Sequence, residues 1–415
     1  MHNLIKDLKA RNLINNITNE EKLKKALAEN KGIYVGFDPS ADSLHLGNYI
    51  MTMLLKRFRL HNIKTFALVG GATGMIGDPS GKSAERNLLD KTILEHNITK
   101  IKYQLEKFTN SQVINNYDFY KNMTFLDFLR DVGKLINSNY LLEKEIISSR
   151  LDVGISYTEF SYNLLQGYDF LQLYKNDNIA IQAGGSDQWG NITTGIEIIR
   201  KSLGDDNIAC GLTINLLTNS EGKKFGKSEK GAIYLDENKS SVYEMYQFLI
   251  NQTDADVEKL LNFLTLIDVD EINKIMQAHK ENPALRIAQK ALAQAVVVDV
   301  HGQQKYEQAL HISQVLFNGN INELNQEEFN IAIKSLPTTK LDKDEIKIID
   351  LLNLANISSS NRVARDFLST GSILVNDIKV NDENFLVKKQ DAINQEFSII
   401  KKGKRNYFLI VWNKD

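Results

Sequence analysis

The first half of the chain alternates between strand-like and helix-like hydrophobic patterns. Residues 3–30 place apolar side chains near helical spacing, which predicts a helix. Four β-rich runs then predict strands at 33–37, 65–70, 112–117 and 179–185. Helical patterns separate these runs at 47–60, 90–108 and 156–175. This alternation predicts a mainly parallel sheet covered by helices, in which ligands bind at the carboxyl ends of the strands.

The pattern changes near residue 240, where the strand-like runs stop. Helical patterns continue through 242–250, 256–264, 272–279 and 283–297, and Pro283 opens the last of them at a first-turn position. The polar stretch 335–345 is a linker candidate. Beyond it we expect helices near 346–354 and 360–369, followed by turn-rich strands that end in 397–412. The predicted fold is therefore α/β, with a Rossmann-like parallel-sheet domain, an all-helical domain and a small α+β module.

Length and composition narrow the class of protein. A chain of 415 residues is too long for one core, so we expect two to three domains. The net charge of −2 gives no global basic field, so any RNA contact must come from local patches. The single cysteine, Cys210, excludes an intramolecular disulfide and a cysteine zinc cluster. We find neither a signal peptide nor a membrane-spanning apolar run, so we expect a cytoplasmic protein without a membrane partner.

Two phosphate-binding patterns come close to a match and fail. The segment from Gly77 to Ser83 ends like a Walker loop, but Ile76 stands where that loop requires its first glycine. Gly71, Gly74 and Gly77 recur at every third residue, which misses the G-x-G-x-x-G dinucleotide pattern. A P-loop enzyme and a dehydrogenase are therefore disfavoured.

A more informative constellation begins at the end of the first predicted strand. The segment 34–40 leaves the strand, and five residues later His45-Leu46-Gly47-Asn48 begins a helix. A helix amino terminus offers free N–H groups and a positive dipole end, which suit phosphate. Gly47 lets an adenine ring lie close, and His45 can donate to a phosphate oxygen. The alternative interpretation is an ordinary helix cap with a surface histidine.

A second constellation is the segment 223–228, with the sequence KKFGKS. Three lysines around a glycine form a cationic loop that can close over a triphosphate. Exposed lysine runs are more often solvated surface, so this segment is weak evidence alone.

A third pattern lies in the predicted helix 156–175. Tyr162, Gln166 and Asp169 fall at i, i+4 and i+7, so one helix face carries all three. A polar face on an otherwise apolar helix suits a pocket that reads a polar ligand. The alternative is a stripe that faces solvent.

HLGN and KFGKS, in this order and with this separation, resemble the two signatures of the class I aminoacyl-tRNA synthetases, H-I-G-H and K-M-S-K-S. Asn48 departs from the last histidine of the first signature, although its amide can still hydrogen-bond a ribose or backbone oxygen. Three longer blocks look like those of the bacterial tyrosyl-tRNA synthetases: GGATGMIGDPSGKSAER, EFSYNLLQGYDF and GGSDQWGN.

The resemblance implies a role for each pocket residue. Tyr34 and Asp169 would hold the phenol hydroxyl of tyrosine, which needs one donor and one acceptor. Its ammonium group would be held by Asp78, Tyr162 and Gln166, and Gln188 would lie near its carboxylate. ATP would lie against Gly36, Asp38, His45, Gly47, Asn48, Asp187 and Lys227.

The implied catalytic residues act on phosphates. Ser40 and His45 would contact the γ-phosphate in the transition state. The leaving pyrophosphate would be enclosed by Lys82, Arg86, Lys224 and Lys227. The attacking tyrosine carboxylate is already an anion, so catalysis needs positioning and charge stabilisation and no general base. We expect ATP to enter with Mg²⁺ as a substrate complex, and the protein itself to hold no metal.

The carboxy-terminal stretch SSSNRVARDFLSTGSILVNDIKVND resembles a small RNA-binding module known from a ribosomal small-subunit protein and from many bacterial tyrosyl enzymes. Candidate phosphate contacts are Arg362 and Arg365 on a predicted helix, and Lys401, Lys402, Lys404 and Arg405 in a predicted basic turn. The alternative for each group is ordinary surface charge.

The resemblance also implies the domain order and the partners. We expect a catalytic domain at 1–233 that includes the KFGKS loop, a helical anticodon-binding domain at 234–338, a linker at 339–345 and an RNA-binding domain at 346–415. The expected partners are tRNA(Tyr), L-tyrosine, ATP and a second copy of the chain. The rival interpretations are a tryptophanyl enzyme of the same fold and a non-catalytic RNA-binding protein built on this scaffold.

Overall fold

The computed structural model of the chain describes residues 3–80, 89–148, 154–220, 222, 225–228, 231–318, 321–334, 336–393, 395–403 and 406–413. The chain divides into two compact units. One comprises residues 1–240 and 249–300, and the other comprises 241–248 and 301–415. The boundaries of these units differ from those of the domains expected from the sequence, which were 1–233, 234–338 and 346–415.

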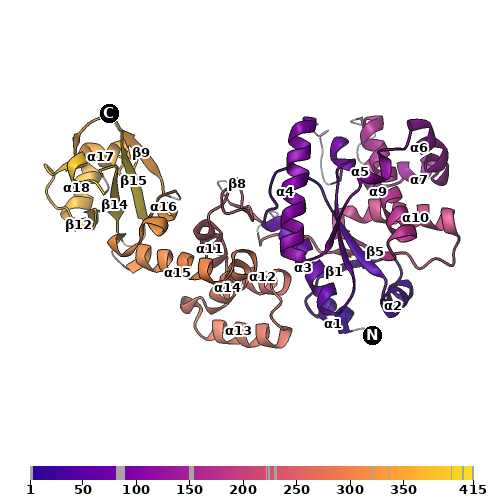
Figure 1. Cartoon of the computed structure of the whole chain (residues 1–415). Helices are drawn as coiled ribbons and strands as arrows, with labels where there is room; N and C mark the ends of the chain where they lie inside the picture. The colour runs from indigo at the N-terminus through magenta and orange to yellow at the C-terminus, as the bar shows by residue number, and fades with distance from the viewer. Residues whose placement is uncertain are drawn as a thin grey trace. The chain divides into compact units, whose positions relative to one another are not determined.

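A six-stranded sheet forms the centre of the first unit (Figure 1). Its strands, in spatial order, are β1 (Ile14–Ile17), β6 (Cys210–Ile214), β5 (Ile179–Gly185), β2 (Gly32–Phe37), β3 (Thr65–Val69) and β4 (Gln112–Asn115). All neighbours pair in parallel except β1, which runs antiparallel to β6. The chain proceeds outward from β2 to β4 and then returns to β5 on the other side of β2. The carboxyl ends of β2 and β5 therefore form the switch point at which open α/β sheets bind ligands.

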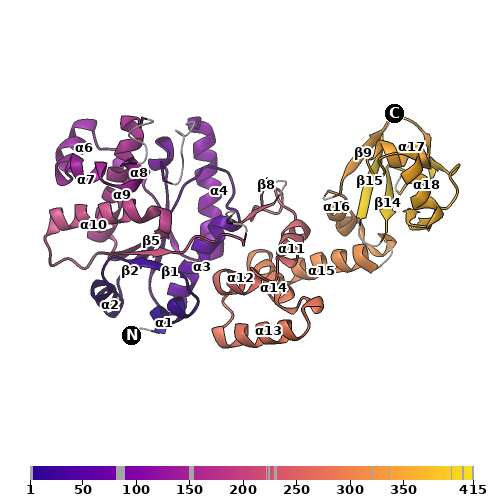
Figure 2. The same cartoon turned by 180° about the vertical axis from the view of Figure 1, so that it is seen from behind.

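Helices cover both faces of this sheet, which confirms the predicted fold class. In both views α3 and α4 lie on one side of the sheet and α9 and α10 on the other (Figures 1 and 2). Tyr34, Phe66 and Leu68 point to the second side and pack with Phe170 and Ile198. The described helices of this part are α1 (Asn3–Ala10), α2 (Glu20–Ala28), α3 (Leu46–Leu60), α4 (Lys91–Thr109), α5 (Tyr117–Tyr120), α6 (Phe125–Asp131), α7 (Ser138–Leu142), α8 (Glu145–Ser148), α9 (Tyr157–Asn176) and α10 (Trp189–Leu203).

The helix expected over 3–30 is wrong. Asn12 has a φ of 55°, a left-handed conformation that ends α1, and Asn19 caps the amino terminus of α2. Between these two helices lies β1, which pairs with β6; the sequence pattern predicted neither strand. This pairing joins segments about two hundred residues apart, so local spacing alone could not reveal it.

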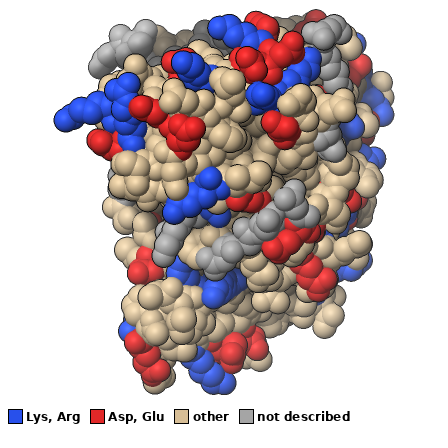
Figure 3. Space-filling view, turned by 90° about the vertical axis from the view of Figure 1, so that its left-hand side faces the viewer, with Lys and Arg blue, Asp and Glu red and all other residues tan. Residues whose placement is uncertain are grey.

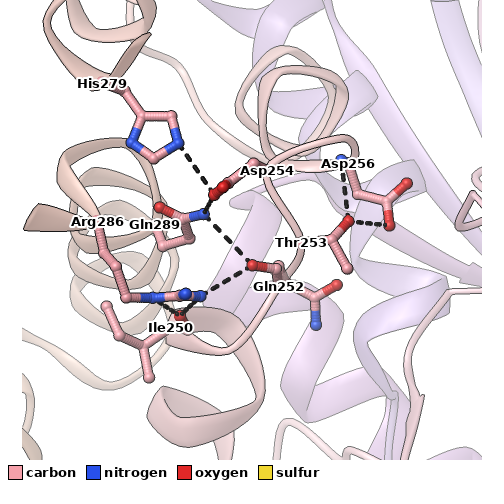
Figure 4. Close-up of polar contacts among 8 residues, drawn as sticks. All are labelled: Ile250, Gln252, Thr253, Asp254, Asp256, His279, Arg286 and Gln289. Atoms are coloured by element: carbon pink, nitrogen blue, oxygen red, sulfur yellow. Dashed lines mark hydrogen bonds and ion pairs between the residues drawn. The ribbon is translucent and has the colours of Figure 1, made fainter. Parts of the chain in front are cut away.

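The helical stretch after residue 240 contains α11 (Val242–Ile250), α12 (Val257–Leu264), α13 (Val269–Glu281) and α14 (Ile287–His301). Pro283 does not open α14; it opens a separate 3₁₀ turn, Pro283–Leu285, after which Arg286 has a φ of 52°. The Arg286 guanidinium donates to the carbonyl oxygens of Ile250 and Gln252 (Figure 4). That side chain ties the start of α14 to the end of α11.

A carboxylate completes the same polar network. The Asp254 carboxylate lies 2.6 Å from Gln289 Nε2 and 3.0 Å from His279 Nε2 (Figure 4). Gln289 also donates to the Gln252 carbonyl oxygen. Two helices, α13 and α14, are thereby attached to the loop that follows α11.

The second unit contains a five-stranded sheet in the order β12 (Ile378–Lys379), β11 (Ile373–Val375), β14 (Phe397–Lys402), β15 (Asn406–Trp412) and β9 (Thr338–Leu341). A separate pair joins β10 (Glu345–Lys347) to β13 (Leu386–Lys388). The segment 339–345, which we expected to be a linker, belongs in part to these strands, because β9 pairs in parallel with β15. Its polar side chains suit an edge strand as well as a linker.

Helices cover both faces of the five-stranded sheet. Ile400 and Ile410 face a core that contains α17 (Ile348–Leu354) and α18 (Asn361–Ser369). Ile399 and Leu409, one position along each strand, face α15 (Gln303–Asn318) and α16 (Gln326–Lys334). This alternation follows from the two-residue period of a strand. The helices at 303–334 therefore share a hydrophobic core with the carboxy-terminal sheet.

Candidate active site

A cavity of about 440 Å³ lies at the carboxyl ends of β2, β5 and β6 in the first unit. It brings together the predicted pocket residues that the structure describes with their side chains: Tyr34, Gly36, Asp38, Ser40, His45, Gly47, Asn48, Asp78, Tyr162, Gln166, Asp169, Asp187 and Gln188. Lys82, Arg86 and Lys224 lie outside the described residues, and for Lys227 only the backbone is described. Segments far apart in the sequence thus converge on one site.

One end of the cavity is lined by the buried side chains of Tyr34 and Asp169. The Tyr34 hydroxyl, on β2, has no hydrogen-bond partner among the described residues. Asp169, on α9, accepts from Tyr120 Oη at 2.7 Å on one oxygen and from Asn116 Nδ2 at 3.0 Å on the other. A buried hydroxyl without a partner costs about 1–3 kcal/mol, so this end is built to receive a polar group.

Burial controls the ionisation of both groups. It raises the pKa of Asp169 to about 7, while the hydrogen bonds from Asn116 and Tyr120 oppose that rise. Burial and the nearby Asp169 raise the pKa of Tyr34 well above its ordinary value, so Tyr34 keeps its proton. The pair therefore offers one O–H donor and one carboxylate acceptor to a ligand.

A chain of amides lies beside a second carboxylate, Asp78. Gln188 Nε2 donates to Asp78 Oδ2 at 2.7 Å. Asn191 Nδ2 lies 2.9 Å from Gln166 Oε1 and 3.1 Å from Gln188 Oε1, so it holds both glutamines. Asp78 is mostly buried, and Ser80 N donates to its other oxygen. A carboxylate surrounded by neutral acceptors is the environment that an ammonium group prefers.

Asp38 and Tyr162 extend this polar region toward β2. The Tyr162 hydroxyl lies 3.4 Å from Asp38 Oδ1. Burial, followed by the charges of Asp38, Asp78 and Asp169, raises the pKa of Tyr162 well above its ordinary value. Tyr162 therefore stays neutral among three carboxylates.

His45 is the N-cap of α3. Its Nδ1 accepts from Gly47 N at 3.0 Å and Asn48 N at 3.3 Å, and the Asn48 side chain accepts from His45 N at 3.1 Å. A neutral imidazole that accepts at Nδ1 carries its proton on Nε2. His45 therefore caps α3 and also lines the cavity, and its contact with a phosphate stays a prediction. Asn48 completes the capping box, an arrangement that an asparagine side chain supplies well.

The two signature segments meet at the start of α3. Gly226 has a φ of 92°, and a Cβ there would stand 2.7 Å from Gly47 N. Ile233 N donates to the Gly226 carbonyl oxygen, and Leu46 N donates to the Ile233 carbonyl oxygen. The hairpin of β7 (Lys227–Ser228) and β8 (Gly231–Ala232) is therefore attached to the helix terminus that His45 caps. Gly36 is open instead: a Cβ there would meet nothing within 4 Å, so the strand leaves room for a ligand.

Sequence reasoning missed three residues that hold the pocket in place: Asn116, Tyr120 and Asn191. Asn116 and Asn191 are completely buried. Each contacts a residue that we expected to bind substrate. Asn191 ends the block GGSDQWGN, where we gave it no role, and Asn116 and Tyr120 belong to no motif that we recognised. A polar asparagine near the end of the predicted strand 112–117, as at 116, was the available signal.

Lys401 and Lys402, two of the four basic residues expected in a turn at 401–405, lie at the end of the strand β14. Lys401 lies over the Tyr407 ring, on the sheet face of α15 and α16, whereas Lys402 lies over the Phe367 ring on the opposite face. Successive residues of β14 point to opposite sides, which the prediction of a turn overlooked. Lys404 and Arg405 lie outside the described residues.

The arginines of α18 are both exposed at the surface. Arg365 donates to Glu383 at 2.8 Å, and Arg362 lies one turn earlier on the helix. The molecular face in Figure 3 carries Lys and Arg in small groups with Asp and Glu between them. Phosphate contacts by Arg362 and Arg365 therefore stay a prediction.

Among the described residues, no group of three or more His, Cys, Asp or Glu side chains gathers where it could hold a metal ion. None of the described helices combines the length and the apolar character that a membrane crossing requires.

Comparisons with known proteins agree with this geometry. Residues 25–318 match the family model of the class I tRNA synthetases (W and Y), and residues 328–410 match a tyrosine–tRNA ligase SYY-like C-terminal domain. The chain is 91% identical to a tyrosine–tRNA ligase of Ureaplasma parvum over 100% of both chains. It is 46% identical to one of Mycoplasma capricolum over 99% of both.

A solved structure also resembles this chain. The C-terminally truncated mitochondrial tyrosyl-tRNA synthetase of Aspergillus nidulans superposes with a TM-score of 0.69 at 28% identity. The match covers 76% of this chain and 94% of that one. The chain therefore belongs to the class I tRNA synthetases of the tryptophan and tyrosine type.

Proposed function

We propose that this chain is a tyrosine–tRNA ligase, which activates L-tyrosine with ATP to tyrosyl-AMP and pyrophosphate and then transfers tyrosine to the 3′ end of tRNA(Tyr). The observation that carries the proposal is the buried Tyr34 hydroxyl, which finds no partner in the described part of the chain, beside the buried Asp169. The resemblance to enzymes of this name over the full chain supports the same reaction.

The phenol of tyrosine fits between Tyr34 and Asp169. Tyr34 O–H donates to the substrate oxygen, and the substrate O–H donates to the Asp169 carboxylate. Phenylalanine would leave the Tyr34 hydroxyl without an acceptor and would give the Asp169 carboxylate no donor beyond Tyr120 and Asn116. The side chain of tryptophan offers an N–H donor and no acceptor for Tyr34, which argues against the tryptophanyl alternative.

The ammonium group of tyrosine fits among Asp78, Tyr162 and Gln166, with Gln188 near the carboxylate. Asp78 supplies the charge, and the amide chain through Asn191 fixes the orientation of the neutral acceptors. Three neutral or anionic oxygen atoms around one cation satisfy its three donors.

Adenylation then requires stabilisation of the phosphates. His45 and Ser40 line the cavity. The His45 Nε2–H and the Ser40 hydroxyl would contact the γ-phosphate as charge develops there. Gly36, Asp38, Gly47, Asn48 and Asp187 line the part of the same cavity proposed for the nucleotide. Lys82, Arg86, Lys224 and Lys227 would close around the leaving pyrophosphate. The Mg²⁺ that accompanies ATP would be held chiefly by the phosphates, as is usual for this ion.

Recognition of tRNA(Tyr) would involve the later parts of the chain. We assign anticodon binding to the helical residues 234–338 and further RNA contacts to residues 346–415. The match of residues 328–410 to a tyrosine–tRNA ligase C-terminal domain supports that assignment.

A homodimer acting in the cytoplasm completes the proposal. Phe125, Leu126 and Tyr157 of the first unit are large apolar side chains that are each more than 60% exposed, as an interface between copies would require. Sedimentation of the wild type and of Leu126→Asp tests this: a dimer should become a monomer, and a wild-type monomer would contradict the proposal.

Amino-acid-dependent exchange of pyrophosphate into ATP tests the proposed reaction. The expected result is exchange in the presence of tyrosine, and no exchange with tryptophan or without an amino acid. Exchange with tryptophan would select the tryptophanyl alternative, and no exchange with any amino acid would select an RNA-binding protein without catalysis.

A further inference from the structure

The Tyr120 hydroxyl lies between two acceptors. It stands 2.7 Å from Asp169 Oδ1 and 2.8 Å from the carbonyl oxygen of Leu165. Tyr120 ends the short helix α5, and its ring is packed against Tyr168 and Phe128. These ring contacts keep the hydroxyl in reach of both acceptors.

A phenol has one proton, so Tyr120 serves only one of these acceptors fully at a time. When Asp169 is ionised, the charge-assisted hydrogen bond to Oδ1 is the stronger one. When Asp169 is protonated, its O–H can donate to Tyr120 Oη, and the Tyr120 proton can turn to the Leu165 carbonyl. Tyr120 can therefore satisfy both protonation states of Asp169.

Asn116 plays a different part at the other carboxylate oxygen. Its Oδ1 accepts from Ala72 N at 2.7 Å, which fixes the amide so that Nδ2 points at Asp169. A fixed N–H donor favours the ionised carboxylate and cannot accept a hydrogen bond from the protonated form. Tyr120 is thus the adjustable partner of Asp169, and Asn116 is the fixed one.

The hydrogen bond from Tyr120 is important because of the groups that surround Asp169. In the described residues, the titratable groups that face it are all phenols: Tyr34 from β2, Tyr120 from α5, and Tyr162 and Tyr168 from α9. The charged groups acting on these phenols are carboxylates, Asp38 and Asp78 on Tyr162 and Asp131 on Tyr168. Hydrogen bonds, rather than a cation, therefore keep the Asp169 charge tolerable, and its pKa lies at about 7.

We propose that Tyr120 is a positioning residue for amino-acid recognition, which holds the Asp169 carboxylate as the acceptor of the substrate phenol through the Oη–Oδ1 hydrogen bond. The inference rests on the proposed function, since it requires tyrosine to bind between Tyr34 and Asp169. As a consequence, when the pH is lowered, a variant that lacks the Tyr120 hydroxyl should lose tyrosine binding at a higher pH than the wild type does.

The test is equilibrium dialysis of tyrosine against the full-length protein from about pH 5.5 to about pH 8.5, a range that brackets the Asp169 titration. Tyr120→Phe should weaken tyrosine binding about tenfold near pH 6.5 and by less than about threefold at the alkaline end. The direction follows because the variant loses a donor to the ionised form, so Asp169 keeps its proton to a higher pH. Tyr117→Phe, on the same helix and exposed, should give the wild-type profile.

A second background identifies the titrating group. In Asp169→Asn the carboxylate is gone, so adding Tyr120→Phe should change tyrosine binding equally at every pH. A pH-dependent difference in that background would overturn the inference, because another group would then be titrating. A single Tyr120→Phe variant that weakens binding equally at all pH values, or leaves it unchanged, would overturn it as well. A wild type that binds no tyrosine would overturn the proposed function itself, which is a separate and recognisable result.

Discussion

Two carboxylates of the first unit, Asp169 in the cavity and Asp254 in the helical stretch, have matching sets of partners and opposite chemistry. Each lies within 3.0 Å of two side-chain hydrogen-bonding atoms. Asp169 is fully buried, and its pKa is raised to about 7. The Asp254 side chain is 58% exposed, and the hydrogen bond from Gln289, followed by that from His279, lowers its pKa (Figure 4).

The difference shows that hydrogen bonds alone do not define a binding site. Water completes the solvation of Asp254, so this carboxylate fastens α13 and α14 to their loop and needs nothing more. Asp169 has no water-accessible surface, and the nearby Tyr34 hydroxyl has no partner among the described residues. Buried polar groups that the fold leaves incomplete are the ones that a ligand completes.

The largest expected effect follows from substituting the two carboxylates alike. Asp169→Ala should reduce the preference for tyrosine over phenylalanine roughly 100- to 1,000-fold, because a charge-assisted hydrogen bond is lost and the phenol O–H of bound tyrosine is buried without its acceptor. Pyrophosphate exchange with each amino acid measures this preference. Asp254→Ala is the matched control and should leave the preference unchanged; an equal loss in both variants would mean that the comparison is mistaken.

The pH dependence of the free energy of unfolding of the ligand-free protein should distinguish Asp169 from Asp254. Folded Asp169 keeps its proton up to about pH 7, whereas an unfolded aspartate loses it near pH 4. The folded state binds the extra proton, so this group lowers the free energy of unfolding by about 2 kcal/mol as the pH rises from about 5 to about 7. Asp169→Asn should remove that slope.

Thermal melting at several pH values measures this contribution. The melting temperature of Asp169→Asn should exceed that of the wild type near neutral pH, and the difference should vanish in acid. The opposite trend, with the variant stabilised most in acid, would show that Asp169 is ionised in the folded protein.

His45 has a structural contact, as Asp254 has, and a proposed ligand contact, as Asp169 has: its ring caps α3, and it lines the cavity. His45→Asn retains a good N-cap but removes the Nε2–H donor, so adenylation should slow about 100-fold while tyrosine affinity and melting temperature change little. Single-turnover formation of the adenylate and tyrosine binding measure the two quantities. A variant that binds tyrosine poorly but reacts at the normal rate would remove His45 from the transition state.

Tyr34→Phe should give the smallest effect on recognition and a gain in stability. Loss of one neutral hydrogen bond to the substrate should raise the KM for tyrosine about tenfold. The ligand-free protein should gain about 1 kcal/mol, because a buried hydroxyl without a partner disappears. Denaturant unfolding of the variant beside Tyr117→Phe tests the gain; an equally stable or weakened Tyr34→Phe protein would mean that the hydroxyl is already satisfied.

The parallel sheet could be predicted from local patterns because its central strands are short apolar runs. The runs at 33–37 and 179–185 were placed within one residue of β2 and β5, and the helices α3, α4 and α9 were placed equally well. Local patterns did not reveal β1 and β6, since each becomes a strand by pairing with a distant segment. The strand β9, in a stretch with the polarity of a linker, was missed for the same reason.

The cavity residues could be named from motifs, whereas their supporting residues could not. Tyr162, Gln166 and Asp169 share a helix face, so their spacing alone places them together. Asn116 and Tyr120 reach Asp169 only because β4 ends beside α9, which is a property of the folded sheet and not of the nearby sequence. Lys82, Arg86 and Lys224 fall outside the described residues, and their roles stay predictions.

The shared core of α15, α16 and the five-stranded sheet determines where the chain can be shortened. A fragment that stops before residue 338 would keep both helices and lose Ile399, Tyr407 and Leu409, against which they pack. Phe329 and Ile333 would then face solvent, and such a fragment would tend to aggregate. We expect a soluble truncation to require removal of those helices together with the sheet. The boundary for engineering therefore lies before α15, and not in the polar stretch 335–345 that the sequence predicted as a linker.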